Sequence, residues 1–70
     1  MMPLTFAKPG EQNKIIRVGG NEKVKKFLES LGFVPGSDVV LVSENHGNVI
    51  TKIRESRIAI SKEMANKIMI

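Results

Sequence analysis

The chain has 70 residues, 41% hydrophobic and 26% charged, a composition ordinary for a globular protein that excludes the disordered and fibrous classes. It contains no cysteine, which excludes disulfides, thiolate metal sites and thiol nucleophiles. Eleven Lys and Arg against seven Asp and Glu give a formal net charge of +4, which suits nucleic acid, an anionic membrane surface or an acidic protein as partner.

The N-terminal part is predicted to contain turns and one strand. Residues 1–7 are too few for a stable helix, and we expect a turn or edge segment anchored by Leu4 or Phe6. Pro9-Gly10 is typical of a type II turn, because proline presets φ at the second position and glycine adopts the positive φ of the third. Residues 14–18 are rich in β-branched side chains and predict a strand with alternating faces, ended by a glycine pair.

Residues 22–31 are predicted to form an amphipathic helix. Asn21 is a good N-cap, and Glu22 lies at the positive end of the helix dipole. The apolar side chains follow the three- and four-residue spacing of one buried stripe, formed by Val24, Phe27, Leu28 and Leu31. We interpret the lysine-rich opposite face as a solvated surface partly neutralised by its own glutamates; the alternative is a binding role for the lysines.

The segment after this helix is predicted to hold the helix at a fixed angle to the next strand. Gly32 suits the left-handed position that ends a helix, and in a Schellman ending Phe33 packs back on Leu28. Pro35-Gly36 then repeats the type II pattern and begins an extended run. We therefore regard residues 31–36 as the stretch around which the chain is organised.

The rest of the chain is predicted to alternate short strands with turns. Turns are expected at residues 44–48, which tolerate positive φ, and at Glu55-Ser56. Ser61 is expected to cap one helical turn over residues 62–65. The predicted strands cover residues 38–43, 49–54, 57–60 and 67–70, and the odd-numbered residues of the second share one face.

Five short strands and one helix predict a mainly β fold. Strands of this length, joined by hairpins and by a helix between the first and second strands, fit a small closed or nearly closed barrel and do not fit a doubly wound sheet. Closure also hides the edges of strands rich in Ile and Val. We expect a single domain over residues 1–70 in the cytoplasm, since we find neither a bilayer-spanning apolar run nor a secretory signal.

We find no set of residues typical of an enzyme and expect no catalysis. One histidine, no cysteine and scattered acidic residues argue against a nucleophile with its base and against a carboxylate pair. The Gly19-Gly20 pair lacks the Lys-Ser/Thr ending of a phosphate-binding loop. His46 with Glu44 and Asn48 is the only local group of potential metal ligands. One imidazole and one carboxylate hold a metal weakly, so we interpret His46 as a turn residue and expect no metal site and no cofactor.

Two groups of residues are candidates for contact with a partner. The first is a basic ridge along the third and fourth strands, formed by Lys52, Arg54 and Arg57. It suits an acidic protein surface or phosphate groups, and scattered solubility charge is the alternative. The second is a groove between the helix ending and the barrel, around Leu31, Phe33 and Met64. In the alternative interpretation Leu31 and Phe33 belong to the core.

Several motifs, in order, extend over nearly the whole chain. The central one is Leu31-Gly32-Phe33-Val34-Pro35-Gly36, preceded by the Gly20 turn and the helix. The start contains Pro3-Leu4-Thr5 and Lys8-Pro9-Gly10-Glu11, and the close contains Arg57-Ile58-Ala59-Ile60 with Glu63, Ala65 and Ile68. Together they resemble the FeoA family, small cytosolic proteins of the bacterial ferrous iron transport system.

The resemblance implies an SH3-like barrel that acts, without catalysis or cofactor, as an accessory to the cytosolic part of FeoB, the membrane ferrous iron transporter. A related barrel ends some iron-dependent repressors, but we find no DNA-binding helix pair in this sequence. The alternative is a basic barrel that binds nucleic acid or regulates transcription. The absence of Tyr and Trp argues against a base-stacking platform and against an aromatic groove for proline-rich peptides.

Overall fold

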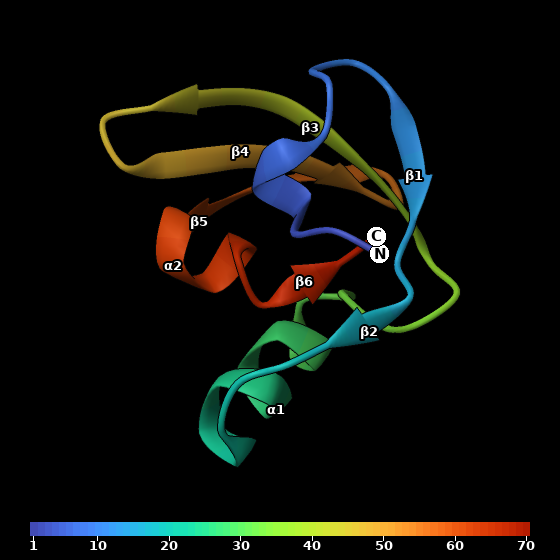
Figure 1. The fold of residues 1–70 in the computed structure, drawn as a ribbon, viewed down its shortest axis with the longest axis vertical. Coiled ribbons are helices and arrows are strands. Elements are labelled where there is room, and N and C mark those ends of the chain that lie inside the picture. The colour runs from blue at the N-terminus through green and yellow to red at the C-terminus, as the bar shows by residue number, and fades with distance from the viewer.

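The computed structural model describes residues 1–70 as two small antiparallel sheets with helices packed beside them (Figure 1). In chain order the elements are the 3-10 helix η1 (Leu4–Phe6), β1 (Gln12–Lys14), β2 (Arg17–Val18), α1 (Glu22–Ser30), β3 (Asp38–Asn45), β4 (Asn48–Ile53), β5 (Ser56–Ser61), α2 (Lys62–Ala65) and β6 (Ile68–Met69). The larger sheet has the strand order β1-β3-β4-β5, and the smaller sheet pairs β2 with β6.

The mainly β fold with a short helix is confirmed, but the strand arrangement differs from the prediction. The structure has six strands in two sheets, where we predicted five strands of one barrel, and the larger sheet does not close on itself. The helix α1 follows β2 and precedes β3, so it does not lie between the first and second strands. The sixth strand and the position of α1 arise because the strand predicted over residues 14–18 is divided between the two sheets.

The chain changes sheets at Ile15 and Ile16. The Ile15 amide donates a hydrogen bond to the Ser37 carbonyl before β3 (2.8 Å), whereas the Ile16 amide donates to the Met69 carbonyl in β6 (2.8 Å). The side chains of Ile15 and Val18 are buried, and that of Ile16 is 55% exposed. The alternation that we predicted for this segment is therefore wrong, because the backbone bends between two partners.

Two tight hairpins join β3 to β4 and β4 to β5. The first turns at His46-Gly47, where both residues have positive φ, as the favoured two-residue hairpin requires. The second turns at Arg54-Glu55, because Ile53 pairs with Ser56. The turn predicted at Glu55-Ser56 is therefore wrong by one residue.

Fourteen buried apolar residues, contributed by both sheets, the helices and the loops, form one core. The inner face of β4 is as predicted, with Val49, Thr51 and Ile53 all buried. The Thr51 hydroxyl donates to a β5 carbonyl (2.9 Å), which satisfies the one buried polar side chain. Leu4 anchors the N-terminal segment in this core, whereas Phe6 is 72% exposed.

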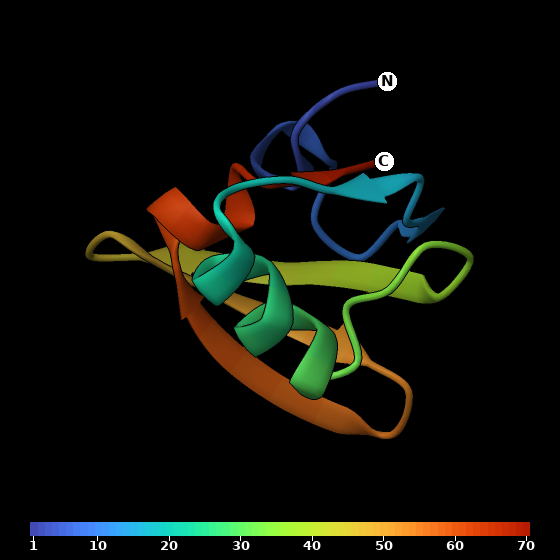
Figure 2. The ribbon, with the colours of Figure 1, turned by 90° about the horizontal axis from the view of Figure 1, so that it is seen from below.

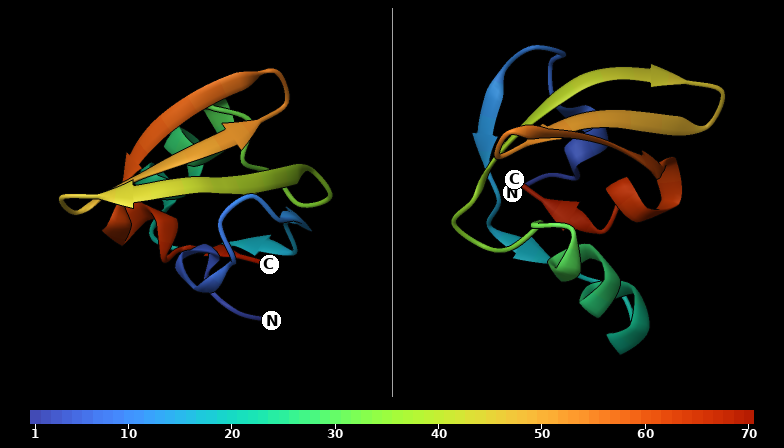
Figure 3. Two further views of the ribbon diagram at one scale, coloured as in Figure 1. Left: turned by 90° about the horizontal axis from the view of Figure 1, so that it is seen from above. Right: turned by 180° about the vertical axis from the view of Figure 1, so that it is seen from behind.

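The two ends of the chain lie side by side (Figure 3). The Met2 amide donates to the Ile70 carbonyl (3.0 Å), and the Ile70 amide donates to the Met2 carbonyl (2.8 Å). Pro3 forms a bridge with Met69 in β6. The N-terminal segment thereby covers the edge of β6 that β2 leaves free.

The helix α1 begins as predicted, but one residue of its predicted buried stripe is exposed. The Asn21 side chain accepts a hydrogen bond from the Val24 amide (2.9 Å). Leu28 is fully buried, and Val24 and Leu31 are half-buried against the core, whereas Phe27 is 48% exposed. Figure 2 shows α1 in front of β4 and β5, and Figure 1 shows it at the opposite end of the molecule from the larger sheet. Phe27 lies outside the side of α1 that packs on the core. None of the helices has the length and apolar character needed to cross a bilayer.

The helix α1 ends in the predicted Schellman motif. Gly32 has a φ of +105°, and its amide donates to the Glu29 carbonyl (3.0 Å). The Phe33 amide donates to the Leu28 carbonyl (3.0 Å), and both of these side chains are fully buried. The chain therefore turns into the core immediately after the helix.

The predicted type II turn follows at Pro35-Gly36. Gly36 has a φ of +90°, and the Ser37 amide donates to the Val34 carbonyl (3.1 Å). The Gly36 amide also donates to the Ile15 carbonyl (2.8 Å). This turn thus holds the point at which the chain changes sheets.

Gly32→Ala is expected to lower the free energy of unfolding by about 1–2 kcal/mol, because a left-handed conformation strains an L residue by about that amount. The added methyl group would make only ordinary contacts, with an Ile53 side-chain atom nearest at 3.7 Å, so the cost arises in the backbone. Gly19→Ala is the matched control: Gly19 lacks a positive φ, and we expect a change below about 0.5 kcal/mol. Equal urea midpoints for the two variants would contradict this account.

Candidate binding site

The groove predicted around Leu31, Phe33 and Met64 is not one surface. Phe33 is fully buried, so its side chain belongs to the core. Leu31 and Met64 are half-buried and pack against that core. Of the three, Met64 lines a surface hollow of about 150 Å³ between α1 and α2, together with Val24, Ser61, Glu63 and Lys67.

The position of Met64 is set by the cap of α2. The Ser61 side chain accepts a hydrogen bond from the Met64 amide (3.2 Å), as the sequence predicts. Val24 reaches the same hollow from α1 and lies one helical turn from the half-exposed Phe27. Met64 therefore shares a hollow with Val24 of α1, and Leu31 and Phe33 do not line that hollow.

Lys52, Arg54 and Arg57 lie on the outer side of the larger sheet. The register forms a row across the four strands, in which Gln12 faces Val40, Val40 faces Lys52 and Lys52 faces Arg57. Directly opposite residues share one face of a sheet, and none of these four is buried. Arg54 follows β4 in the turn to β5.

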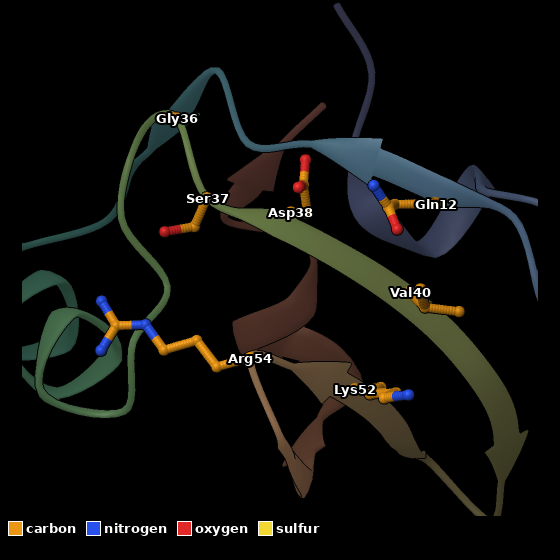
Figure 4. Close-up of a pocket in the computed structure, with 7 residues that line it drawn as sticks. All are labelled: Gln12, Gly36, Ser37, Asp38, Val40, Lys52 and Arg54. Atoms are coloured by element: carbon orange, nitrogen blue, oxygen red, sulfur yellow. The ribbon is translucent and has the colours of Figure 1, made fainter.

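A polar hollow of about 380 Å³ opens on this outer face (Figure 4). Its lining residues are Gln12, Gly36, Ser37, Asp38, Val40, Lys52 and Arg54. In Figure 4 the Arg54 side chain extends from the end of β4 toward the loop that carries Gly36 and Ser37. Lys52 lies toward the other end of the hollow, beside Val40.

The charge around this hollow is positive. The one acidic lining residue, Asp38, is paired with the Lys14 ammonium (3.6 Å), which also donates to the Gly36 carbonyl (3.3 Å). No ion pair is formed by any residue of the predicted ridge, Lys52, Arg54 and Arg57. The structure thus brings two of the predicted cations into one hollow and places the third opposite Lys52.

The backbone of Arg54 is unusual. Its φ is +54°, in the left-handed region that glycine, asparagine and aspartate favour. An arginine in this region is strained by about 1 kcal/mol or more. The hairpin therefore presents a guanidinium group at the edge of the hollow at a cost in stability that glycine would not carry.

The histidine group at the other hairpin lies at an exposed tip. His46 has a φ of +50° and occupies the first position of the β3–β4 turn, as expected for a turn residue. The Glu44 carboxylate is 2.9 Å from the Lys62 ammonium. The structure brings together no three His, Asp or Glu side chains that could hold a metal ion.

Gln12, Ser37 and Asp38 were not predicted to belong to this hollow. Gln12 and Asp38 reach it through the pairing of β1 with β3, in which Gln12 faces Val40 and Lys14 faces Asp38. Because we predicted the first strand at residues 14–18, this register was not available from the sequence. The turn signal at Pro35-Gly36 could have indicated Ser37, since that turn lies directly before β3.

Comparison with known proteins places the chain in a family. A model of the FeoA domain matches residues 2–70. The chain belongs to the FeoA family. The resemblance predicted from the order of motifs over nearly the whole chain is therefore confirmed.

Individual FeoA proteins are similar to this chain along most of their length. A protein of Methanocaldococcus jannaschii named Fe(2+) transport protein A is 34% identical over 70 residues, which cover all of this chain and 85% of that protein. A crystal structure of FeoA, an iron uptake regulatory protein, has a TM-score of 0.85 and 27% identity, covering 94% of this chain and 89% of that one. The zinc-bound FeoA of Stenotrophomonas maltophilia, described as a prokaryotic SH3 domain protein, has a TM-score of 0.85 at 20% identity, covering 99% of this chain and 88% of that one. The fold is therefore the SH3-like fold of FeoA.

Phe33→Ala is expected to lower the free energy of unfolding by about 3–5 kcal/mol, a large part of the stability of a domain of this size. Phe27→Ala truncates a half-exposed phenylalanine, and we expect a loss below about 1 kcal/mol. Urea denaturation of both variants measures the difference. A folded Phe33→Ala variant as stable as Phe27→Ala would show that Phe33 is not a core residue.

Proposed function

We propose that this FeoA-family chain is a non-enzymatic accessory protein of ferrous iron uptake, which binds the cytosolic part of a FeoB-type transporter and modulates it. The observation that carries the proposal is the FeoA domain match over residues 2–70. The relative from Methanocaldococcus jannaschii, which aligns with the whole length of this chain, is named for Fe(2+) transport. In this proposal the protein works in the cytoplasm and reaches the inner face of the membrane through its partner.

The side chains of the two hollows support binding rather than catalysis. Neither hollow is lined by a histidine, and the acidic lining residues, Asp38 and Glu63, lie in different hollows. Neither hollow therefore contains a carboxylate pair or a histidine that could act as a base.

We place the main contact surface on α1 around Val24 and Phe27 and on the hollow between α1 and α2. Val24 and Met64 line the hollow there, and Phe27, one helical turn from Val24, exposes 48% of its surface. Aromatic and methionine side chains are enriched in protein interfaces, where half-exposed apolar groups gain by burial. Lys52 and Arg54 on the outer sheet face would steer an acidic partner, because long-range attraction raises the association rate.

The test is the affinity of the full chain for the purified cytosolic part of the FeoB transporter of the same organism, measured by calorimetry. Phe27→Ala is expected to weaken binding about tenfold or more, the loss that a central aromatic contact produces. Phe6→Ala is the matched control, since Phe6 is 72% exposed on a different element. No binding by the unmodified chain would contradict the proposed function, and equal effects of the two substitutions would contradict the proposed surface.

A further inference from the structure

The outer face of the larger sheet concentrates unpaired positive charge. Lys52 and Arg57 are directly opposite on β4 and β5, where like charges are destabilising and a carboxylate in either place would form a cross-strand ion pair. Neither residue has a salt-bridge partner. A bound anion would relieve the repulsion between these two cations.

Neutral hydrogen-bonding groups complete the lining of the hollow beside these cations. Ser37 and Gln12 line it from the loop before β3 and from β1. The acidic lining residue, Asp38, is already paired with Lys14 (3.6 Å). The volume of about 380 Å³ lies at the lower end of the about 300–1,000 Å³ found for small-molecule sites, and the hollow is open to solvent.

The two lining cations lie apart. Figure 4 shows the Arg54 guanidinium on the side of Ser37, and Lys52 on the side of Val40 and Gln12. Arg54 keeps this position although its backbone φ of +54° is strained. A guanidinium binds phosphate oxygens in a bidentate manner, and an ammonium group attracts phosphate as a point charge. An anion with two linked phosphate groups could therefore engage both ends.

We propose that this hollow is a binding site for a diphosphate group, either free pyrophosphate or the diphosphate of a nucleotide. Arg54 and Ser37 bind one phosphate, and Lys52 and Gln12 bind the other. Arg57 adds to the positive potential from the neighbouring strand. No aromatic side chain lines the hollow, so nothing there stacks on a nucleotide base. This site lies away from the hollow between α1 and α2 and does not depend on the contact proposed there, although its two cations are also the charges proposed to steer the transporter.

The test is a ¹⁵N NMR titration of the full chain at constant ionic strength with pyrophosphate, phosphate, ADP or succinate. Pyrophosphate is expected to produce saturable shifts at the amides of Ser37 and Arg54, and phosphate is expected to bind more weakly. An affinity for ADP equal to or lower than that for pyrophosphate supports a site for free diphosphate. A higher affinity for ADP supports a site for a nucleotide. The absence of saturable shifts, or succinate binding as tightly as pyrophosphate, would overturn the proposal.

Variants locate the site. Arg54→Gly and Lys52→Gln are each expected to weaken pyrophosphate binding about tenfold, as the loss of a charge-assisted hydrogen bond does. Glycine adopts the positive φ of position 54 without strain, so the hairpin is retained. Lys23→Gln removes the same charge from the exposed face of α1 and is the control. Equal losses of pyrophosphate affinity in Lys23→Gln and Lys52→Gln would show that the effect depends on net charge alone and would overturn the proposed site.

Discussion

The left-handed ending of α1 is the constraint on which the rest of the structure depends. With Gly32 at a φ of +105°, the Glu29 and Leu28 carbonyls accept hydrogen bonds from the next turn, and Phe33 enters the core. The type II turn that follows exchanges hydrogen bonds with Ile15, where the chain passes from one sheet to the other. One short segment thereby links the end of α1 to the start of β3 and to the point where the chain passes from one sheet to the other.

The features that the sequence predicts well are those whose cause is local. Asn21 caps α1, Ser61 caps α2 and the two Pro-Gly turns form, because each needs only neighbouring residues to satisfy a backbone group or to adopt a positive φ. The division of residues 14–18 is not local. It depends on two different partners for adjacent amides, Ser37 and Met69, which no periodicity of side chains records. The exposure of Phe27 has a similar origin, since the spacing predicts a stripe but not how much of it the sheet covers.

The distinction between local and non-local causes also applies to the candidate surfaces. The pairing of Lys52 with Arg57 was not predicted, because a turn at Glu55-Ser56 would have placed Arg57 opposite Arg54, and the turn lies one residue earlier. The neutral partners in the polar hollow come from strand register, which the sequence does not reveal. Leu28 and Phe33 are buried in the core, while the helix junction and the outer sheet face each carry a solvent-accessible hollow.

The central claim is that the segment ending α1 is part of the stable core rather than a surface connection. Native-state hydrogen exchange at the Phe33 amide tests it most directly, because this amide forms the closing hydrogen bond to Leu28. We predict that its opening free energy is close to that of global unfolding. Exchange as fast as at the exposed His46-Gly47 turn would contradict the claim.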